Sequence, residues 1–478
     1  MKIGLILDNP RRDFGGIALL AYQFLKRGHE ALVIPMYDQG YDVPLLGLDA
    51  VIVNYARTSN LDFIRSYKEM GITVIVLDTE GGIFPEEGDG SPEFWARRFR
   101  SIGAYDYVDC YLFWGQRTHD AFKEHSGLAE DRMRITGCPR YDYCDPKWRK
   151  VLHYPRSGHI LINLNFPSIN PWWGRAEYSK TDKKMIFHSA FKEISNVAKI
   201  VNVDVNRALP LEQERMRVLN EYVRVIDEIA ARNPERNFIV RPHPFENMHI
   251  YREVFADRPN VTVDSFGEVT HVISSAEFVI HLNCSTSVET RLLGKLPVSL
   301  EFLNSELLRV NIYLPSQISH PVHNVEQLDE IIKDPNRISR DRLTDKAVRE
   351  HVYPWFYKCD GNAGERVADV VSEIVQSRTA MRRKPGYWMS AKSCYATAKS
   401  RYLVQGIANN LIGSYALTRI RMLLHGQRRM KYVRAETIKN RIQELAGCEG
   451  KEIQLAVAYA RHPATGAKMA TVRVSRDR

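Results

Sequence analysis

The chain has 478 residues, of which 44% are hydrophobic and 26% charged, with a formal net charge of +10. This composition is typical of a soluble globular protein, and the length predicts two or three domains. No apolar run approaches the roughly 20 residues that span a bilayer, and the N-terminal apolar stretch is too short for a signal peptide. The seven cysteines form no CxxC pair, which argues against a cysteine-bound metal and indicates reduced thiols. We therefore expect a cytoplasmic protein with no metal site and no resident cofactor.

The first 150 residues alternate between strand and helix patterns. Apolar runs that predict strands lie at 2–8, 29–36, 49–55, 72–78, 108–115 and 132–142. Segments that predict helices lie between them, at 17–28, 59–71 and 118–127. Such alternation is typical of a parallel sheet with right-handed crossovers, so residues 1–150 are expected to form one Rossmann-like domain.

A second alternating series follows a polar linker. Strands are predicted at 159–166, 238–244, 261–264, 278–283 and 297–302, and helices at 211–233 and 363–377. The last helix is expected to cross back to the first domain, so the second domain is assigned residues 151–376. Because open parallel sheets bind ligands at the carboxyl ends of their strands, we predict an α/β fold of two Rossmann-like domains facing a cleft. Residues 436–478 predict a small αββ appendage.

The positive charge is concentrated near the C-terminus. Residues 377–435 contain thirteen Lys and Arg and no Asp or Glu, and subtracting these thirteen charges from +10 leaves about −3 for the remainder. The stretch is rich in aromatic and aliphatic residues but is interrupted by Asn409, Asn410 and Arg419, so it is too polar to span a bilayer. It suits a basic amphipathic segment at an anionic membrane surface. The alternative is a solvated basic face packed against the rest of the protein. No nucleic-acid motif accompanies the charge, and no nucleic-acid partner is expected.

The sequence Arg241-Pro242-His243-Pro244 directly follows an apolar strand. The two prolines remove backbone donors and fix the loop, which holds His243 and Arg241 at a strand end. A histidine donor and an arginine fork suit the phosphate of a leaving group. The alternative is a strand-end histidine that is satisfied by the backbone.

A second polar motif, residues 283–289, lies between a strand and a helix. Its small hydroxyl residues either cap the helix or present hydroxyl and N–H groups to an anion. Asn163 and Asn165, at the end of the first strand of the same domain, are fainter candidates. The predicted nucleotide or phosphate ligands from these segments are Ser285, Thr286, Ser287, Glu289, Asn163 and Asn165. Glu289 either reaches a ribose or base or completes a capping box.

A third motif, Asp78-Thr79-Glu80-Gly81-Gly82, lies at the exit of a strand in the first domain. The glycines permit a close ligand approach or a positive φ. A carboxylate at such a strand exit can serve as a base for a substrate hydroxyl or as a nucleophile. Glu80 is the first candidate for this role and Asp78 the second. The alternative is an acidic turn whose side chains are solvated. For two further segments, 136–140 and 360–362, we expect structural turns rather than ligand contacts.

Together these motifs resemble two related groups of proteins. The RPHP sequence, Ser285-Thr286 and the Asp78–Gly81 segment are similar to motifs of bacterial sialyltransferases and Kdo transferases, with Thr79 in place of the first acid of an acidic pair. The motif order is also similar to that of the surface carbohydrate biosynthesis protein family over roughly residues 1–375. The segments that carry this second resemblance are Arg12–His29, Leu77–Gly82, Thr136–Asp142, Asn163–Phe166, Arg241–Pro244, Cys284–Glu289 and Asp360–Arg366.

The resemblance implies a GT-B glycosyltransferase that moves a CMP-activated ulosonic acid, such as Kdo or a nonulosonate, to a surface polysaccharide or lipid-linked glycan. It implies that the second domain binds CMP, that His243 supports the departing phosphate and that no metal is needed. Inverting and retaining relatives both exist, so the carboxylate is either a base or a nucleophile.

Two other functions stay open. A polyol-phosphate transferase that uses a CDP-glycerol or CDP-ribitol donor also has an RPHP-type site on a GT-B scaffold. A non-catalytic scaffold of a polysaccharide assembly complex is the second alternative, although the presence of Glu80, His243 and Ser285 argues against it. In each case the protein is expected at the inner face of the cytoplasmic membrane.

Overall fold

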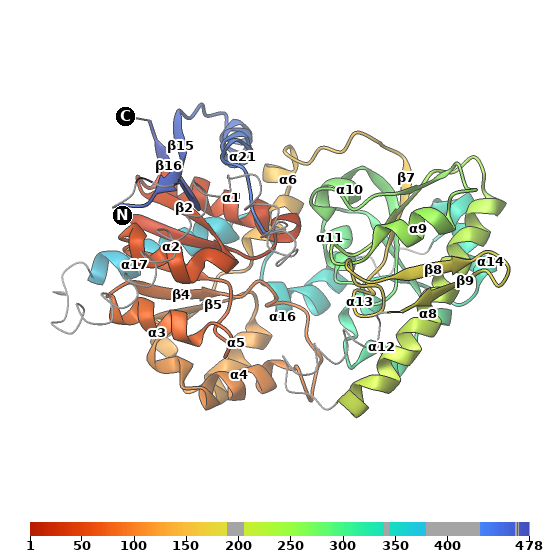
Figure 1. The fold of residues 1–478 in the computed structure, drawn as a ribbon, viewed down its shortest axis with the longest axis horizontal. Coiled ribbons are helices and arrows are strands. Elements are labelled where there is room, and N and C mark those ends of the chain that lie inside the picture. The colour runs from red at the N-terminus through yellow and green to blue at the C-terminus, as the bar shows by residue number, and fades with distance from the viewer. Residues whose placement is uncertain (189–204, 339–343, 379–430, 464–465, 467, 478) are drawn as a thin grey trace, which may run out of the picture. The chain divides into compact units, whose positions relative to one another are not determined.

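The computed structural model describes residues 1–188, 205–338, 344–378, 431–463, 466 and 468–477. These residues divide into two compact units, each built around its own sheet (Figure 1). Unit 1 comprises Met1–Gly82, Glu87–Val151 and Tyr353–Arg478, and unit 2 comprises Ile83–Glu86 and Leu152–Val352.

Unit 1 contains an eight-stranded sheet in the order β15-β16-β2-β1-β3-β4-β5-β6. Its strands are β1 (Lys2–Leu7), β2 (Glu30–Pro35), β3 (Ala50–Val53), β4 (Thr73–Leu77), β5 (Cys110–Phe113), β6 (Met133–Ile135), β15 (Leu455–Arg461) and β16 (Lys468–Arg476). Its helices are α1 (Pro10–Lys26), α2 (Gln39–Leu46), α3 (Leu61–Glu69), α4 (Pro92–Ser101), α5 (Gln116–His125), α6 (Pro146–Arg149), α16 (Tyr353–Phe356), α17 (Ala363–Arg378) and α21 (Ala435–Cys448). Strands β1 to β6 are parallel, as their buried runs of Val, Ile and Leu favour.

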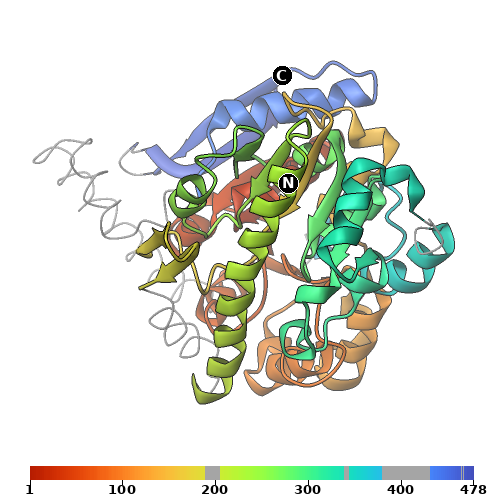
Figure 2. The same ribbon diagram turned by 90° about the vertical axis from the view of Figure 1, so that its right-hand side faces the viewer.

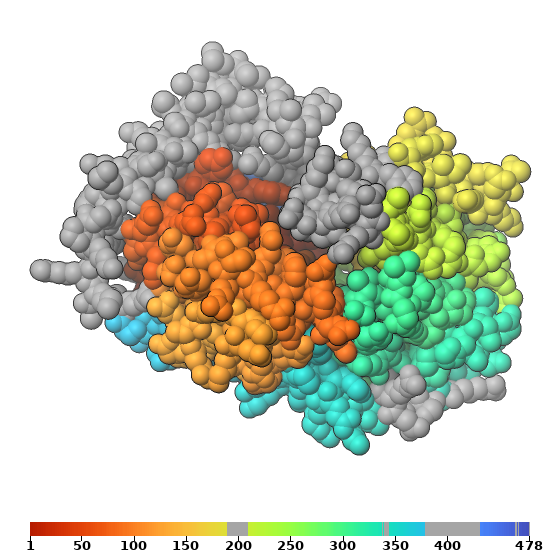
Figure 3. Space-filling model, turned by 90° about the horizontal axis from the view of Figure 1, so that it is seen from below, coloured from red at the N-terminus to blue at the C-terminus, as the bar shows by residue number. Residues whose placement is uncertain are grey.

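The strand order of unit 1 reverses between β1 and β3. The chain runs from β1 out to β2 and returns to pair β3 on the other side of β1. Right-handed connections then place α1 and α3 on opposite faces of the sheet. Helices α3, α4 and α5 share one hydrophobic core with the sheet and form the orange surface in Figure 3. Such a reversal leaves a crevice at the carboxyl ends of the strands, where open α/β sheets bind ligands.

Helix α1 begins at the carboxyl end of β1 because local signals fix its first turn there. The Asn9 side chain accepts a hydrogen bond from the Arg11 N–H, and Pro10 occupies the first helical turn. The chain leaves the helix at Gly28, which has a φ of +73° that favours glycine. This start places Arg12 and Asp13 in the first turn, next to the exit of β1.

The C-terminal part of the chain belongs to unit 1. Helix α17 packs along α1, and its first N–H groups, those of Ala363 and Gly364, donate to the Asp142 carboxylate at 3.0 and 2.8 Å. Helix α21 also packs on α1, and β16 pairs antiparallel with β2. The expected helix and two strands are therefore present, but they extend the N-terminal sheet instead of forming a separate appendage. Their apolar faces are buried there, with Val472 and Val474 almost inaccessible.

Unit 2 contains a six-stranded parallel sheet in the order β11-β10-β7-β12-β13-β14. Its strands are β7 (His159–Asn163), β10 (Phe238–Arg241), β11 (Val261–Val263), β12 (Ala276–His281), β13 (Leu296–Leu300) and β14 (His320–Val322). Its helices are α8 (Val205–Arg232), α9 (Met248–Val254), α10 (Val269–Ser275), α11 (Thr286–Leu292), α12 (Glu306–Arg309), α13 (Leu314–Gln317), α14 (Val325–Lys333) and α15 (Asp345–Ala347). The strand order reverses between β7 and β12, which places the ligand-binding crevice of this sheet at their carboxyl ends.

A two-stranded antiparallel sheet of β8 (Ala176–Ser179) and β9 (Lys184–Phe187) interrupts the series after β7. It lies beside the long helix α8 (Figure 2), where the Met185 N–H donates to the Asn220 side chain at 2.7 Å. This hairpin was not predicted from the sequence because each of its strands has only four residues. Met185 and Phe187 nevertheless point inward and join the core of unit 2.

The predicted α/β class with two Rossmann-like parallel sheets is confirmed by this topology. The basic stretch expected to bind a membrane lies almost wholly outside the described residues. Within the part of the chain that is described, every helix is too short or too polar to cross a membrane.

Candidate functional site

The RPHP loop leaves β10 at the carboxyl edge of unit 2, two strands from β12. His243 is half-buried there, and its Nδ1 accepts a hydrogen bond from the Phe245 N–H at 3.3 Å. A ring nitrogen that accepts this bond carries no proton, so the neutral ring holds its proton on Nε2. The backbone therefore selects the tautomer in which His243 is an Nε2–H donor.

Glu246 fixes this loop from beneath. Its Oε1 accepts hydrogen bonds from the His243 N–H at 3.0 Å and from the Phe166 N–H at 2.8 Å, and its Oε2 accepts from the Tyr251 hydroxyl. The residue is only 3% exposed. One buried carboxylate thus ties the loop after β10 to the loop after β7. Burial raises the pKa of Glu246 to about 7.

Arg241 differs from its expected role. Its guanidinium donates to the backbone carbonyls of Phe266 at 3.0 Å and Gly267 at 2.5 Å, in the loop after β11. This buried arginine therefore positions a neighbouring loop of unit 2. The contacts favour a structural role over the predicted phosphate contact.

The loop after β12 is held from both sides. His281 is fully buried, and its Nδ1 accepts from the Cys284 N–H at 3.4 Å while its Nε2 donates to the Ser319 hydroxyl at 2.8 Å. Burial lowers the pKa of His281 to about 4, so this histidine stays neutral. Asn283 has a φ of +48° and exchanges two amide hydrogen bonds with Asn304. These contacts give the loop a fixed conformation before any ligand binds.

The crevice between β7 and β12 brings two predicted residues together. The Asn163 amide donates to the Thr286 hydroxyl at 2.7 Å, and Thr286 in turn contacts Cys284 Sγ at 3.1 Å. Asn163 is only 4% exposed, and its Oδ1 has no hydrogen-bond partner among the described residues. A buried amide oxygen without a protein partner is uncommon, and this one is available to a water or a ligand at the crevice.

The other predicted residues of this loop lie in different environments. Ser285 is exposed and makes no side-chain cap on α11, so capping does not explain its presence. Ser287 and Glu289 are buried beneath the loop, and Asn165 is exposed just past β7. The structure therefore leaves Ser285, Thr286 and Asn163 at the crevice, whereas the side chains of Ser287 and Glu289 are buried.

In unit 1, Asp78 and Glu80 follow β4 and share Arg57, and Glu80 also pairs with Arg12. Arg12 NH1 lies 2.8 Å from Glu80 Oε1, and Arg57 contacts Asp78 at 3.5 Å and Glu80 at 3.9 Å. Asp78 also accepts from the Glu80 N–H at 2.9 Å and from the Tyr111 hydroxyl at 3.3 Å. The two predicted carboxylates therefore lie next to each other, at the exit of a central strand.

The two carboxylates have opposite electrostatic environments. Burial raises the pKa of Asp78 and outweighs the nearby Arg57. The Glu80 side chain is 59% exposed, and Arg12 and Arg57 together hold its pKa below the ordinary value. Asp78 is therefore suited to accept a proton, whereas Glu80 keeps its negative charge.

The charged network extends to the C-terminal part of the chain. Arg12 also contacts Asp8 at 2.9 Å and Asp13 at 2.8 Å, and Asp8 accepts from Lys431 at 2.6 Å. The Lys431 side chain is only 7% exposed. A residue more than 350 positions from Glu80 therefore completes the cluster around it, which no local sequence pattern indicates.

The two glycines after Glu80 pack against an aromatic side chain. A Cβ on Gly82 would lie 2.5 Å from Trp114, and one on Gly81 would lie 2.9 Å from it. Neither glycine has a positive φ. Close packing against Trp114 therefore explains both glycines, in place of the expected ligand approach or left-handed turn.

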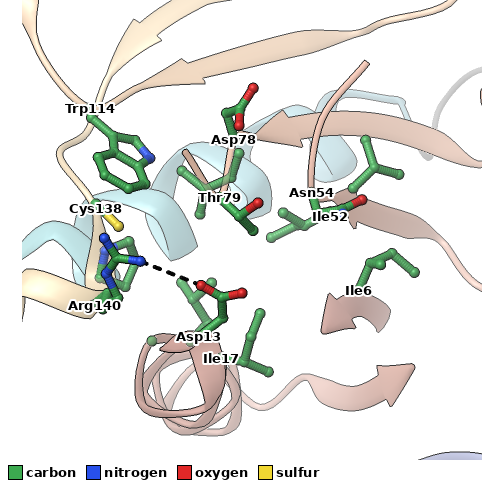
Figure 4. Close-up of a pocket in the computed structure, with 15 residues that line it drawn as sticks. Ile6, Asp13, Ile17, Ile52, Asn54, Asp78, Thr79, Trp114, Cys138 and Arg140 are labelled. Atoms are coloured by element: carbon green, nitrogen blue, oxygen red, sulfur yellow. Dashed lines mark ion pairs between the residues drawn. The ribbon is translucent and has the colours of Figure 1, made fainter. Parts of the chain in front are cut away.

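A pocket opens beside these carboxylates, at the reversal between β1 and β3 (Figure 4). Asp78 and Thr79 lie on its wall after β4, and Asn54 lies after β3. At its rim, Arg140 NH1 is 3.6 Å from Asp13 Oδ1. Unit 1 thus has a pocket at the position where its topology predicts one.

The two fainter motifs join each other inside unit 1. Arg366 donates to the Thr136 carbonyl at 2.8 Å and pairs with Asp360 at 2.8 Å. Asp142 caps α17 as described above, and burial raises its pKa to about 7. Both motifs therefore fasten α17 to the exit of β6, as the preference for structural turns predicts.

Several residues of the candidate site were not found from the sequence. Arg12 lies in a segment singled out only for its resemblance, and Glu246 follows the RPHP sequence by two residues. Their proximity to these motifs is the one signal that points to them. Arg57 and Lys431 have none, because strand order and tertiary contacts bring them to Asp78 and Asp8. Among the described residues, no three His, Cys, Asp or Glu side chains are grouped to hold a metal ion.

Comparisons with known proteins give structural likenesses alone, since neither a protein-family model nor a curated protein matches the sequence. The structure is similar to the UDP-GlcNAc 2-epimerase of Methanocaldococcus jannaschii, with 12% identity and a TM-score of 0.45 over 78% of this chain and 100% of that chain. The Neisseria meningitidis UDP-GlcNAc 2-epimerase gives 12% identity and 0.44 over 78% and 100%. The wall teichoic acid polymerase TagF gives 11% and 0.49 over 79% and 90%.

Such low identities and TM-scores carry no argument about activity. The fold assignment rests on the strand order of the two sheets, and the motif resemblance to sialyltransferases, Kdo transferases and the surface carbohydrate biosynthesis family stays a prediction.

Glu246 gives a testable pH dependence. Its pKa of about 7 in the folded protein exceeds the ordinary 4.5, so the folded state holds the proton more tightly. This contribution to stability is fully present below about pH 4.5 and is lost as the pH rises through 7. Glu246→Gln keeps an oxygen for the two N–H groups and has no charge to bury. We therefore expect its free energy of unfolding to fall less than that of the wild type over this range, by up to about 3 kcal/mol.

The measurement is urea denaturation at a series of pH values, followed by tryptophan fluorescence. The exposed Glu253, on α9, provides the control variant Glu253→Gln, which is expected to follow the wild type. If the free energy of unfolding had the same pH dependence in the wild type and in Glu246→Gln, this carboxyl would not have a raised pKa in the folded protein.

Proposed function

We propose that the protein is a group transferase of the GT-B type that takes a sugar from a nucleotide donor and builds a surface glycan. In this proposal unit 2 binds the nucleotide and unit 1 binds the acceptor. The observation that carries it is the pair of strand-order reversals: each sheet places polar residues at the crevice where α/β sheets bind ligands, and the two crevices differ in chemistry.

The crevice of unit 2 suits the phosphate of a nucleotide. His243 offers an Nε2–H, and Ser285 offers a hydroxyl in a loop that His281 and Asn283 hold rigid, whereas the Thr286 hydroxyl donates to Cys284 Sγ within that loop. Fixed neutral donors stabilise the charge that develops on a leaving phosphate without reorganising during the reaction. The donor that the motifs favour is a CMP-activated ulosonic acid, such as Kdo or a nonulosonate.

The crevice of unit 1 suits an acceptor hydroxyl. In an inverting reaction Asp78 or Glu80 removes the proton of this hydroxyl while its oxygen bonds to the sugar carbon and the bond to the nucleotide phosphate breaks. In a retaining reaction the carboxylate itself bonds to that carbon first. Glu80 was the first choice from the sequence, but the raised pKa of Asp78 favours Asp78 as the base and Glu80 as a permanent charge that holds Arg12 and Arg57.

The direct experiment is to incubate the full chain with a panel of nucleotide donors and measure release of the nucleotide. CMP-sugars, CDP-glycerol, CDP-ribitol and UDP-sugars form the panel, and phosphorus NMR of the product separates the two transferase chemistries. A glycosyl product contains no new phosphodiester, whereas the alternative polyol-phosphate transferase leaves one in the acceptor. Failure of every donor with a range of glycan acceptors would favour the non-catalytic scaffold.

The basic stretch 377–435 extends the proposal to the membrane. Thirteen positive charges without a carboxylate suit an anionic lipid surface, and lipid-linked acceptors would be concentrated there. Sedimentation with liposomes of varied anionic lipid content tests this. Binding that rises with anionic lipid and falls with salt is expected, and indifference to both would favour a packed basic face.

A further inference from the structure

The pocket of unit 1 contains two buried polar groups without partners. Trp114 is 3% exposed and Asn54 is 2% exposed, and both line the pocket. Trp114 Nε1 and Asn54 Oδ1 have no hydrogen-bond partner among the described residues. Buried indole N–H and amide groups nearly always find partners, because leaving one unmade is costly. Two such groups in one pocket indicate that a ligand supplies what they lack.

One polar atom of the Asn54 amide lacks a hydrogen bond whichever way the amide is turned. Its Nδ2 donates to the Met36 sulfur, a weak acceptor, at 3.2 Å, and the side chain also hydrogen-bonds to Tyr55, whereas its Oδ1 has no hydrogen-bond partner among the described residues. In this orientation the pocket therefore offers one acceptor, Asn54 Oδ1, and one donor, Trp114 Nε1–H. Turning the amide exchanges its ends and still leaves one polar atom without a partner.

The two groups lie on opposite sides of the pocket (Figure 4). Asn54 follows β3 and Trp114 follows β5, with β4 between them. Two strand spacings separate their backbones by about 10 Å. A ligand that carries its donor and its acceptor on different atoms can therefore pair with both groups from between them.

Much of the remaining lining is aliphatic, although Asp78 and Thr79 also line the pocket. Ile6, Ile17, Leu20, Ile52 and Leu77 line it. The charged pair at the rim, Asp13 and Arg140, is already matched at 3.6 Å. An anionic group there would lie near Asp78 and would lose its hydration without a new counter-charge. The lining therefore disfavours an anion and accommodates a group with an apolar end.

We propose that this pocket holds the secondary amide of an N-acylated amino sugar on the acceptor. An acetamido group has an N–H for Asn54 Oδ1, a carbonyl for the Trp114 N–H on its opposite side, and a methyl group for the aliphatic lining. The inference rests on the proposed function in that unit 1 binds the acceptor. It adds the acceptor's chemical class and places a sugar ring next to Asp78.

The test is calorimetry of the full-length protein with simple methyl glycosides and no nucleotide. Methyl N-acetylglucosaminide and methyl N-acetylgalactosaminide are compared with methyl glucoside and with the free amine, methyl glucosaminide. We expect at least one N-acetyl compound to bind about tenfold tighter or more than both compounds that lack the amide, because each of those leaves the two buried groups unpaired. Equal affinities, or no measurable binding of any glycoside, would overturn the proposal.

Two variants test whether the preference for the N-acetyl compound arises in this pocket. Asn54→Leu removes the acceptor, and Trp114→Phe removes the indole N–H while keeping an aromatic ring against Gly81 and Gly82. Each is expected to reduce the preference for the N-acetyl compound by about tenfold, and Trp173→Phe, at a 39% exposed residue of unit 2, is the matched control. A preference that persists in both pocket variants places the amide elsewhere. Because no nucleotide is present, the result is independent of the donor assay.

Discussion

His243→Ala is expected to lower the turnover number by at least about a hundredfold while the protein remains folded. The imidazole sits on a loop that Glu246 and two prolines hold, and the Phe245 N–H fixes its Nε2–H as the donor. Removing a positioned donor at a leaving phosphate has an effect of this size. Steady-state release of the nucleotide from the preferred donor measures it.

Two further variants separate chemistry from folding. His249→Ala changes an exposed histidine on the neighbouring helix α9 and is expected to keep wild-type turnover. His243→Gln restores an N–H donor and is expected to recover part of the loss. Wild-type turnover in a folded His243→Ala protein would remove His243 from the mechanism.

Glu80→Gln is expected to reduce transfer by at least about a hundredfold. The substitution removes the negative charge that pairs with Arg12 at 2.8 Å and with Arg57 at 3.9 Å, and so disturbs the whole cluster at the exit of β4. The same loss follows if Glu80 is the nucleophile. Initial rates of transfer to the glycan acceptor measure the effect, and Glu87→Gln, at an exposed carboxylate of the same unit, is the control.

The pH profile distinguishes the two carboxylates. A base must be ionised to work, so the rate of an enzyme that uses Asp78 falls as the pH drops below the raised pKa of this group. Asp78→Asn is expected to lose most of the activity together with this acid limb. An acid limb that persists unchanged in the residual activity of Asp78→Asn would assign it to another group.

The sequence predicted the sheets well because parallel strands are buried on both faces and appear as short apolar runs. It placed His243, Thr286 and Glu80 at strand exits correctly, since a strand exit is a local feature. It did not provide the strand order, and the meeting of Asn163 with Thr286 depends on β7 lying next to β12.

Arg241 shows the limit of arguing from residue type. An arginine beside a histidine at a strand end suits a phosphate. The Arg241 side chain instead donates its hydrogen bonds to the carbonyls of a loop that lies 25 residues further along the chain. Lys431 shows the converse, because nothing near it in the sequence suggests a contact with Asp8. Contacts between distant segments decided both cases.

The central claim, that unit 2 binds the nucleotide through the crevice between β7 and β12, is tested most directly by calorimetric titration of CMP into three proteins. Asn163→Leu removes a buried amide at this crevice and is expected to weaken CMP binding about tenfold or more, whereas Glu80→Gln, in unit 1, is expected to bind CMP as the wild type does. Undiminished binding to Asn163→Leu, or loss of binding in Glu80→Gln, would contradict the account.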